Sequence, residues 1–503
     1  MRRGTTQSPL PFYYCSRRVR LPAFRYTRPP PGICRCLNLK PSNEVPLHNH
    51  LLCFKFYFLS LLYSMKSLAR NFLFAILWII PIFAFAQDKQ AGSSWKDTKD
   101  GFYKEIFMDS GIQLYGRKNL IAADFLGAEY EVFLRTTLVG TGNDTLMQHK
   151  CFVGWEGDTN GALLYPDGSP RFRMIYVNGG LAGSHGRSLG EDGRERFREY
   201  VRNGGSYLGT CAGAFVASQG YINVKDEYTP NKNYLGIWPG RVRDTYLADK
   251  WLTMYMDEDC PLLKYYDFGG DLKVENIYHL NGPYAALEPQ DMPPAGTLPL
   301  LRVDYDTIPP QGPSIDNQVT CWAYKANDIA GTVISMASHP EEITEGERLH
   351  LMAAFLQYAM DNTGSPIVKG ELVSGQMREM NKATEDAAPE FTKIGDRQYH
   401  HFTVDVPKRT RKLIITLEGA DGTDLSLAAM PGEFAFLKDA AVKDESAGSR
   451  KTIVLKKPQA GKWYISVFCE TAPDAEFGEN GVIYTGRTDV LNGVPYKVSV
   501  VLK

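Results

Sequence analysis

A cysteine lies in a stretch whose glycine spacing suits nucleophilic chemistry. The sequence Gly-Thr-Cys-Ala-Gly at 209–213 ends an apolar run and leads into a helix-prone segment. A strand-to-helix turn of this kind holds its central residue in a strained conformation, where side chains two residues away would meet the neighbouring chain. Gly209 and Gly213 relieve that crowding. The pattern therefore predicts a nucleophile elbow around Cys211, whose sulfur faces the first turn of a helix, where thiolate is favoured.

A second segment supplies a base and a group to orient it. Ser338-His339-Pro340-Glu341 follows the apolar run 332–337. In an extended backbone His339 and Glu341 project to the same side, and Pro340 fixes the chain between them. We therefore expect Cys211 as nucleophile, His339 as base and Glu341 as the orienting carboxylate. The plainer alternative for the elbow alone is a small buried cysteine that fills a tight turn.

These residues need a sheet that brings distant segments together. Two amphipathic helices are expected: a surface helix at 191–203, and a helix at 345–360 that should pack on the sheet. Strands are expected at 130–134, 173–177, 207–210 and 332–337. The carboxyl ends of parallel neighbours share one edge of a sheet, so Cys211 and His339 should meet there.

The elbow and the His-Pro-Glu element resemble the Cys-His-Glu triad of class I glutamine amidotransferases. The resemblance is sharpest to the amidotransferase-like domain found at the N-terminus of eukaryotic biotin-protein ligases and in stand-alone bacterial proteins. It extends to the strand and Gly-Gly turn at 175–180. It implies an α/β, flavodoxin-like, three-layer domain with a mostly parallel sheet over 95–361.

The resemblance also implies roles for residues around the nucleophile. The Gly179-Gly180 turn would help to bind an oxyanion, with the N–H groups of Gly180 and Ala212 as donors. His279 and Asn281 belong to a segment that lines the site in this family, and both are candidate pocket residues. For His279, a turn that holds a histidine with satisfied hydrogen bonds is an equal alternative.

The sequence also departs from the family in ways that bear on activity. It shows no synthetase domain, ATP-binding motif, ammonia-accepting partner or biotin ligase domain, so neither ammonia delivery nor biotin transfer is expected. We expect a cysteine-dependent hydrolase that acts on an amide of a small molecule, a peptide or a cell-surface polymer, without cofactor or metal. The alternative is a non-catalytic ligand- or polymer-binding protein that retains the amidotransferase fold.

The segment 65–86 has the composition of a secretory signal peptide. It combines a basic start at Lys66 and Arg70, an apolar stretch over 72–83 and an Ala-x-Ala cleavage site at 84–86. The apolar stretch is shorter than the ~20 residues of a spanning helix. We therefore expect export to the periplasm or the extracellular space, without stable membrane insertion after cleavage.

Residues 1–64 are expected to be mistranslated upstream sequence or disordered, with Met65 as initiator. On that interpretation Cys34-x-Cys36 and the nearby histidines are not a metal site. This segment carries ten Lys or Arg residues against the single acid Glu44, although the whole chain has 56 basic and 57 acidic residues. The remainder is therefore acidic, which makes nucleic acid an unlikely partner. Five cysteines follow the signal, and an odd number in an oxidising compartment leaves at least one thiol unpaired.

The C-terminal part has the alternation of β-strands. We expect a linker over 362–391 and a small β-sandwich over 392–503 that folds by itself. The second part resembles the bacterial pre-peptidase C-terminal domain through Tyr-His-His-Phe-Thr-Val at 399–404 and Gly-Lys-Trp-Tyr at 461–464. That resemblance implies an accessory or binding module beside a secreted hydrolase.

Overall fold

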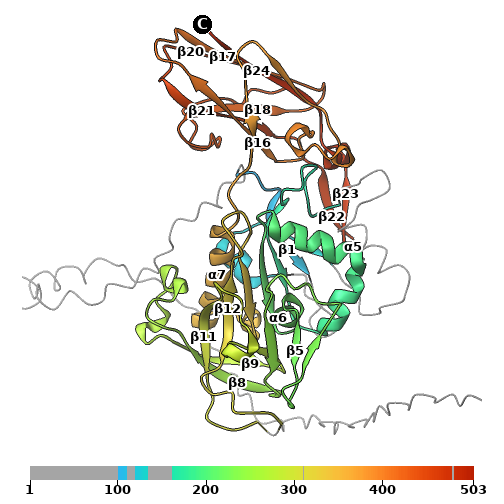
Figure 1. The fold of residues 1–503 in the computed structure, drawn as a ribbon, viewed down its shortest axis with the longest axis vertical. Helices are drawn as coiled ribbons and strands as arrows, with labels where there is room; N and C mark the ends of the chain where they lie inside the picture. The colour runs from blue at the N-terminus through green and yellow to red at the C-terminus, as the bar shows by residue number, and fades with distance from the viewer. Residues whose placement is uncertain (1–99, 110–118, 134–160, 310, 479–480) are drawn as a thin grey trace, which may run out of the picture. The chain divides into compact units, whose positions relative to one another are not determined.

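A nine-stranded mixed sheet forms the centre of the N-terminal part. The computed structural model describes residues 100–109, 119–133, 161–309, 311–478 and 481–503 (Figure 1). The first five strands of the sheet are mutually parallel and the last four continue it with antiparallel pairings. In sheet order the strands are β2 (Tyr130–Phe133), β1 (Lys104–Asp109), β3 (Phe172–Val177), β4 (Ser206–Thr210), β13 (Val333–Met336), β12 (Val319–Tyr324), β11 (Leu298–Asp304), β8 (Lys250–Tyr255) and β9 (Lys273–His279).

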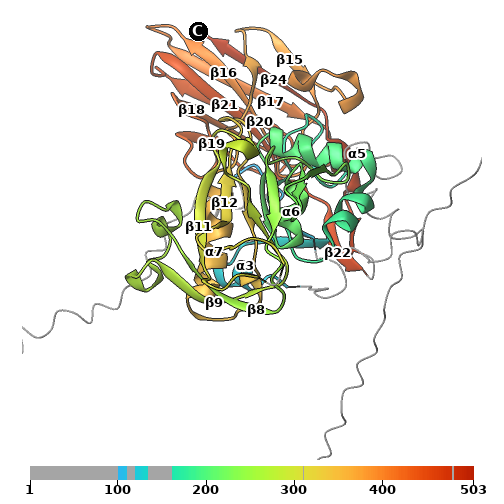
Figure 2. The ribbon, with the colours of Figure 1, turned by 60° about the horizontal axis from the view of Figure 1, so that its bottom comes forward.

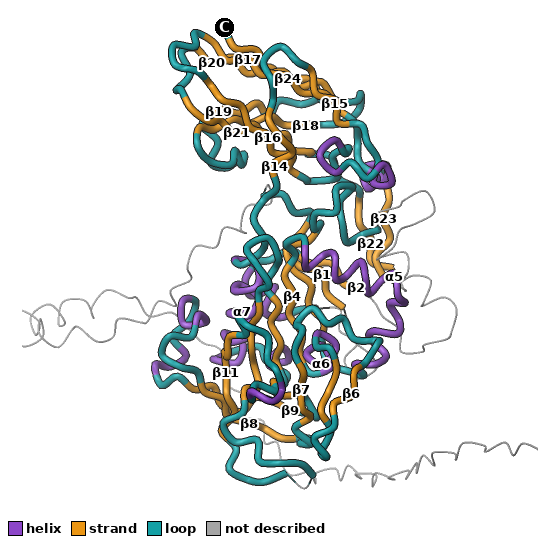
Figure 3. Tube along the Cα trace, viewed as in Figure 1, coloured by secondary structure: helices purple, strands orange, loops and turns teal. Residues whose placement is uncertain are grey.

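The predicted fold class, a flavodoxin-like α/β domain with a mostly parallel sheet, is wrong. Half of the pairings in the nine-stranded sheet are antiparallel, and strands dominate the described part of the chain, where the α-helices are few (Figure 3). The reason lies between the elbow and the His-Pro-Glu segment. Parallel neighbours need a crossover of a dozen or more residues, usually a helix. Residues 228–324 contain no α-helix, so β8, β9, β11 and β12 join the sheet in antiparallel order.

The α-helices of the described residues divide between two apolar cores. One core contains Ile106 and Met174, with residues of α3 and α7. The other core contains Phe107 and Ile175, with residues of α5. Side chains alternate along a strand, so Ile106 and Phe107, and likewise Met174 and Ile175, face opposite sides of the sheet. α5 and α6 lie together, apart from α3 and α7 (Figure 2). These helices are α3 (Ile121–Leu126), α5 (Ala182–Arg202), α6 (Ala212–Ala217) and α7 (Gly346–Asp361).

A small four-stranded sheet follows the helix after the elbow. Its order is β10-β7-β5-β6, with β5 and β7 parallel and the outer pairings antiparallel. The strands are β5 (Gly220–Ile222), β6 (Tyr228–Pro230), β7 (Arg241–Asp244) and β10 (Pro283–Ala285). Short 3-10 helices are η2 (Pro261–Lys264), η3 (Phe268–Gly270), η4 (Pro289–Asp291), η5 (Pro340–Glu342), η6 (Thr384–Asp386), η7 (Pro389–Phe391) and η8 (Thr488–Asn492).

Two further sheets enclose one apolar core in the C-terminal part. Residues 362–391, expected to be a linker, contribute one strand to each of them. The five-stranded sheet is β14 (Val368–Glu371), β16 (Tyr399–Val406), β21 (Gly461–Cys469), β18 (Leu425–Pro431) and β19 (Val442–Asp444). The four-stranded sheet is β15 (Met377–Met380), β24 (Tyr496–Leu502), β17 (Lys412–Gly419) and β20 (Arg450–Lys456); a separate hairpin pairs β22 (Asp474–Gly478) with β23 (Gly481–Thr485).

Buried polar contacts connect the C-terminal sheets to the strand β3 region. Arg171, just before β3, forms an ion pair with Asp396 at 2.6 Å, and both side chains are 1% exposed. Arg171 also donates to the hydroxyl of Tyr484 at 2.8 Å, which donates to Glu131 in β2. Lys369 in β14 pairs with Asp167 at 2.6 Å. Charges at these positions are therefore compensated inside the protein.

Several sequence-based expectations concern residues outside the described ranges. These are the upstream segment 1–64, the signal peptide 65–86 and Cys151. Among the described residues no helix is both long and apolar enough to cross a membrane. The described cysteines Cys211, Cys260, Cys321 and Cys469 are buried free thiols.

Candidate active site

Cys211 occupies a strained turn between β4 and α6. Its φ of 49° and ψ of −106° lie in a region that residues with a side chain rarely adopt. A Cβ on Gly209 would lie 2.5 Å from the carbonyl carbon of Gly213, and one on Gly213 would lie 2.2 Å from the carbonyl oxygen of Val177. The close approach of the backbone therefore leaves no room for a side chain at either position.

The structure brings Cys211, His339 and Glu341 together. His339 follows β13, the parallel neighbour of β4, so the two strands end at the same edge of the sheet. The Nδ1 atom of His339 lies 2.7 Å from Oε1 of Glu341, and the histidine is 1% exposed. Cys211 and His339 line the same cavity, and the sulfur also donates to the carbonyl oxygen of Leu280 at 3.4 Å.

The charges around His339 favour the imidazolium form. Burial by itself lowers the pKa of this imidazole, but the Glu341 carboxylate and the Cys211 sulfur outweigh burial and raise the pKa to about 10. At neutral pH His339 then holds a proton that it can give to a leaving group. A protonated imidazole beside a cysteine is an arrangement that nucleophilic catalysis by cysteine uses.

Two residues that the sequence did not single out hold Glu341 in place. The hydroxyl of Thr210 donates to Oε1 of Glu341 at 3.3 Å, and Tyr176 shares a 3.1 Å hydrogen bond with Thr210. Thr210 is the last residue of β4 and Tyr176 lies in β3, and both are buried. Their inward direction follows from strand register, which local composition does not reveal.

The predicted oxyanion segment lies beside the nucleophile. A Cβ on Gly179 would come within 2.4 Å of Cε1 of His339, so the absence of a side chain lets the imidazole pack there. Gly180, at φ 137°, and Ala212 both line the cavity with Cys211. Ala212 is the first residue of α6, and its N–H therefore has no acceptor within the helix. Gly180 and Ala212 thus both belong to the lining of the cavity that contains Cys211.

His279 and Asn281 differ in what they contact. Asn281 lines the cavity, at φ 51°. His279 is fully buried, with Nε2 2.7 Å from the hydroxyl of Thr245 and Nδ1 2.8 Å from that of Ser338. Burial lowers the pKa of His279 to about 3, so it is neutral. It is therefore a satisfied interior histidine rather than a residue of the pocket, and it anchors the residue before His339.

The cavity at Cys211 has a volume of about 610 Å³, within the range of small-molecule sites. Aromatic side chains and two charged groups, Arg187 and Asp244, line it beyond the predicted residues. The aromatic residues are Phe215, Tyr221, Tyr234 and Tyr246. No group of three or more His, Cys, Asp or Glu residues in the described ranges is arranged to hold a metal ion.

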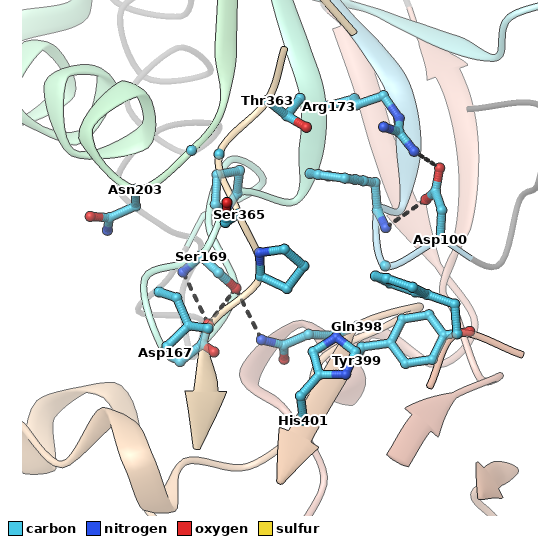
Figure 4. A pocket seen from close by; sticks show the side chains of 18 of the residues that line it. Asp100, Asp167, Ser169, Arg173, Asn203, Thr363, Ser365, Gln398, Tyr399 and His401 are labelled. Atoms are coloured by element: carbon cyan, nitrogen blue, oxygen red, sulfur yellow. Dashed lines mark hydrogen bonds and ion pairs between the residues drawn. The ribbon is translucent and has the colours of Figure 1, made fainter. Parts of the chain in front are cut away.

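A second cavity, of about 260 Å³, lies between residues near β3 and the start of β16 (Figure 4). Its carboxylates are engaged: Asp100 pairs with Arg173, and Asp167 with Lys369. The hydroxyl of Ser169 donates to Asp167, but Lys369 holds the pKa of that carboxyl group well below its usual range, so the carboxylate is a weak base. The arrangement suited to covalent chemistry is therefore the one at Cys211.

Comparison with known families supports part of the resemblance. Residues 169–243 match the family described as "Biotin-protein ligase, N terminal". This span includes the Gly-Gly turn and the elbow, and it ends before His339 and Glu341. The resemblance predicted from the motifs is thus confirmed over these residues, as a similarity to a biotin-protein ligase-related or amidotransferase-like fold.

Two solved structures each match less than a third of the chain. The pre-peptidase C-terminal domain of a collagenase from Bacillus anthracis is 13% identical, with 27% of this chain and 99% of that chain covered and a TM-score of 0.17. The Aeromonas hydrophila periplasmic inhibitor of g-type lysozyme is 16% identical, with 21% and 76% covered and a TM-score of 0.14. The first of them is the kind of domain that the C-terminal motifs resemble. No curated protein matches the chain.

Proposed function

We propose that this protein is an amidotransferase-like enzyme that hydrolyses an amide through Cys211, His339 and Glu341. The observation that carries the proposal is the strained elbow cysteine beside a histidine that is itself held by a buried carboxylate. A structural cysteine has no need of a strained backbone, which costs of order 1–3 kcal/mol. The match to the biotin-protein ligase N-terminal family over the elbow adds support.

The proposed reaction has two halves. The thiolate of Cys211 attacks the amide carbonyl, and the negative oxygen accepts hydrogen bonds from the N–H groups of Gly180 and Ala212. The carbon–nitrogen bond breaks as His339 gives its proton to the departing amine, which leaves a thioester. A water molecule then gives a proton to His339 and attacks the thioester, releasing the carboxylic acid and the thiolate. Glu341 orients His339 throughout.

Alkylation by iodoacetamide at neutral pH, mapped by mass spectrometry, tests the reactivity of Cys211. Cys211 should be labelled much faster than Cys260, because burial raises the pKa of Cys260 to about 11. The His339→Gln variant should lose most of this difference. Slow labelling of all cysteines alike would contradict the proposal and favour the alternative, a binding protein that keeps the fold.

Export is proposed as well, from the signal-like composition of 65–86. The mature chain should then begin near Gln87, outside the reducing cytoplasm. Amino-terminal sequencing of protein recovered from the periplasm or medium checks this. A terminus that precedes Met65 would contradict it.

A further inference from the structure

Asp244 brings a negative charge to the cavity of Cys211. It ends β7 and lines that cavity with the nucleophile. Its Oδ1 accepts a hydrogen bond from the backbone N–H of Tyr246 at 2.7 Å. No Lys, Arg or His of the described residues forms an ion pair with Asp244. Within the part of the chain that the structure describes, the carboxylate therefore lines the cavity without a partner in an ion pair, although Arg187 and His339 line the same cavity.

The neighbouring arginine is committed elsewhere. Arg243 projects to the other side of β7, where it pairs with Asp226 at 2.6 Å and with Asp291 at 3.2 Å. Arg187, the cation that lines the cavity, is exposed and donates to the hydroxyl of Ser184 at 3.0 Å. Asp226 and Asp291, on one side of β7, thus form ion pairs with an arginine, whereas Asp244, on the other side, forms no ion pair among the described residues.

A carboxylate removed from water without a counter-ion is unfavourable, and a bound cation offsets that cost. Burial raises the pKa of Asp244 to about 6, so the group is mostly ionised at neutral pH. The aromatic rings of Tyr221, Tyr234 and Tyr246 line the same cavity, and the faces of such rings attract cations as well. The carboxylate of Asp244 and the tyrosine rings thus both favour a cationic ligand.

We propose that Asp244 determines substrate specificity by binding a cationic group, an ammonium or guanidinium, of the amide that Cys211 attacks. This inference rests on the proposed function and adds to it the class of substrate. Asp244 takes no part in bond breaking; it positions the substrate through charge.

Three methanethiosulfonates that differ in charge test the proposal on the full chain. Each transfers its sulfenyl group to the Cys211 thiolate, which forms a disulfide and releases methanesulfinate. The rate of each charged reagent is divided by the rate of the neutral methyl reagent. On that scale, the cationic aminoethyl reagent should modify wild-type Cys211 faster than the anionic sulfonatoethyl reagent. In Asp244→Asn this preference for cations should fall about fivefold or more, the size expected of one unit charge in a partly buried site.

The Asp249→Asn variant is the matched control, since it removes the same charge from an exposed position outside the cavity. It should keep the wild-type preference. Each rate is divided by that of the neutral reagent, so a change in the reactivity of Cys211 itself cancels in Asp244→Asn. Reaction of Cys211 ahead of the buried Cys260 shows that this variant is folded. An unchanged charge preference in that variant overturns the role of Asp244. Failure of the neutral reagent to favour wild-type Cys211 over Cys260 would instead overturn the proposed function.

Protection then tests the substrate class directly. 6-Aminohexanamide and heptanamide differ only in an ammonium in place of a methyl group. The cationic amide should protect wild-type Cys211 from the neutral reagent at a concentration at least fivefold lower, and this advantage should disappear in Asp244→Asn. Equal protection by both amides, or none by the cationic one, contradicts the inference.

Discussion

Gly179 shows how closely single residues are constrained at this site. The imidazole of His339 occupies the space that a Cβ at Gly179 would need, and its Nδ1–H donates to Oε1 of Glu341 at 2.7 Å. Packing at that density leaves no room for the ring to move without losing a contact. The position of His339 therefore depends on the lack of a side chain at Gly179 as much as on the carboxylate of Glu341.

Gly179→Ala should disable the site while leaving the fold in place. The new methyl group displaces His339, and a misplacement of about 1 Å costs roughly 100-fold in rate, with about 1–3 kcal/mol of stability lost to overpacking. Alkylation of Cys211 and urea denaturation measure the two effects. The control is Gly183→Ala, whose methyl group meets only the flexible end of Arg187, at 3.3 Å. Equal reactivity in both variants would refute the packing argument.

The charge on His339 links stability to pH. Its pKa is raised from an ordinary value of about 6.5 to about 10 in the folded protein. The interaction therefore stabilises the fold fully below pH 6.5, and the benefit is lost as pH rises to about 10. The difference in unfolding free energy between wild type and His339→Gln should shrink across that window, by up to about 1.4 kcal/mol per pH unit. Urea denaturation at pH 6.5, 8 and 10 checks this, and a constant difference would count against it.

At the scale of elements, β14 and β15 change where the C-terminal part begins. β14 pairs with β16, and β15 pairs with β24. Leu372, one residue after β14, and Met380, the last of β15, are buried in the shared core. A chain that starts at residue 392, as the sequence suggested, would lack both strands.

A fragment of residues 366–503 should therefore unfold cooperatively, and one of residues 392–503 should not. Loss of buried Leu or Met side chains costs about 2–5 kcal/mol each, against a total stability of about 5–15 kcal/mol for a domain. Thermal unfolding followed by circular dichroism distinguishes the two fragments. Similar sharp transitions for both would show that β14 and β15 are dispensable.

Across the whole chain, buried charge joins segments that lie far apart in sequence. Arg171 and Asp396 are 225 positions apart and almost completely buried. Burial of such a pair is costly in itself, but removal of one partner costs more, because the other charge is left uncompensated.

Asp396→Asn should destabilise the protein by about 3–5 kcal/mol. The combined variant Arg171→Met with Asp396→Leu should recover a large part of that loss. Glu379→Gln is the control, since its ion pair with Lys497 is on the surface, with side-chain exposures of 51% and 49%, and should change stability little. Urea denaturation gives all three values. A loss below about 1 kcal/mol for Asp396→Asn would contradict a structural role for the pair.

The sequence by itself determined the local geometry of the elbow. The glycines two residues before and after Cys211 are needed because side chains there would clash within a single turn. Such a requirement depends only on nearby residues, so it can be recognised in the sequence. The spacing of His339 and Glu341 likewise describes a short segment. Strands at 173–177 and 207–210 were placed correctly within a residue for the same reason, since β3 and β4 are short segments rich in β-branched, aromatic or apolar residues.

Only the tertiary structure decided the rest. Whether a strand pairs parallel or antiparallel depends on partners distant in sequence, which is why the mostly parallel sheet was predicted wrongly. Thr210 and Asp244 reach the site through strand register, and a histidine at 279 looks the same in sequence whether it faces a cavity or, as here, two hydroxyl groups. Local sterics can be read along the chain, but burial and charge compensation arise only when distant segments meet.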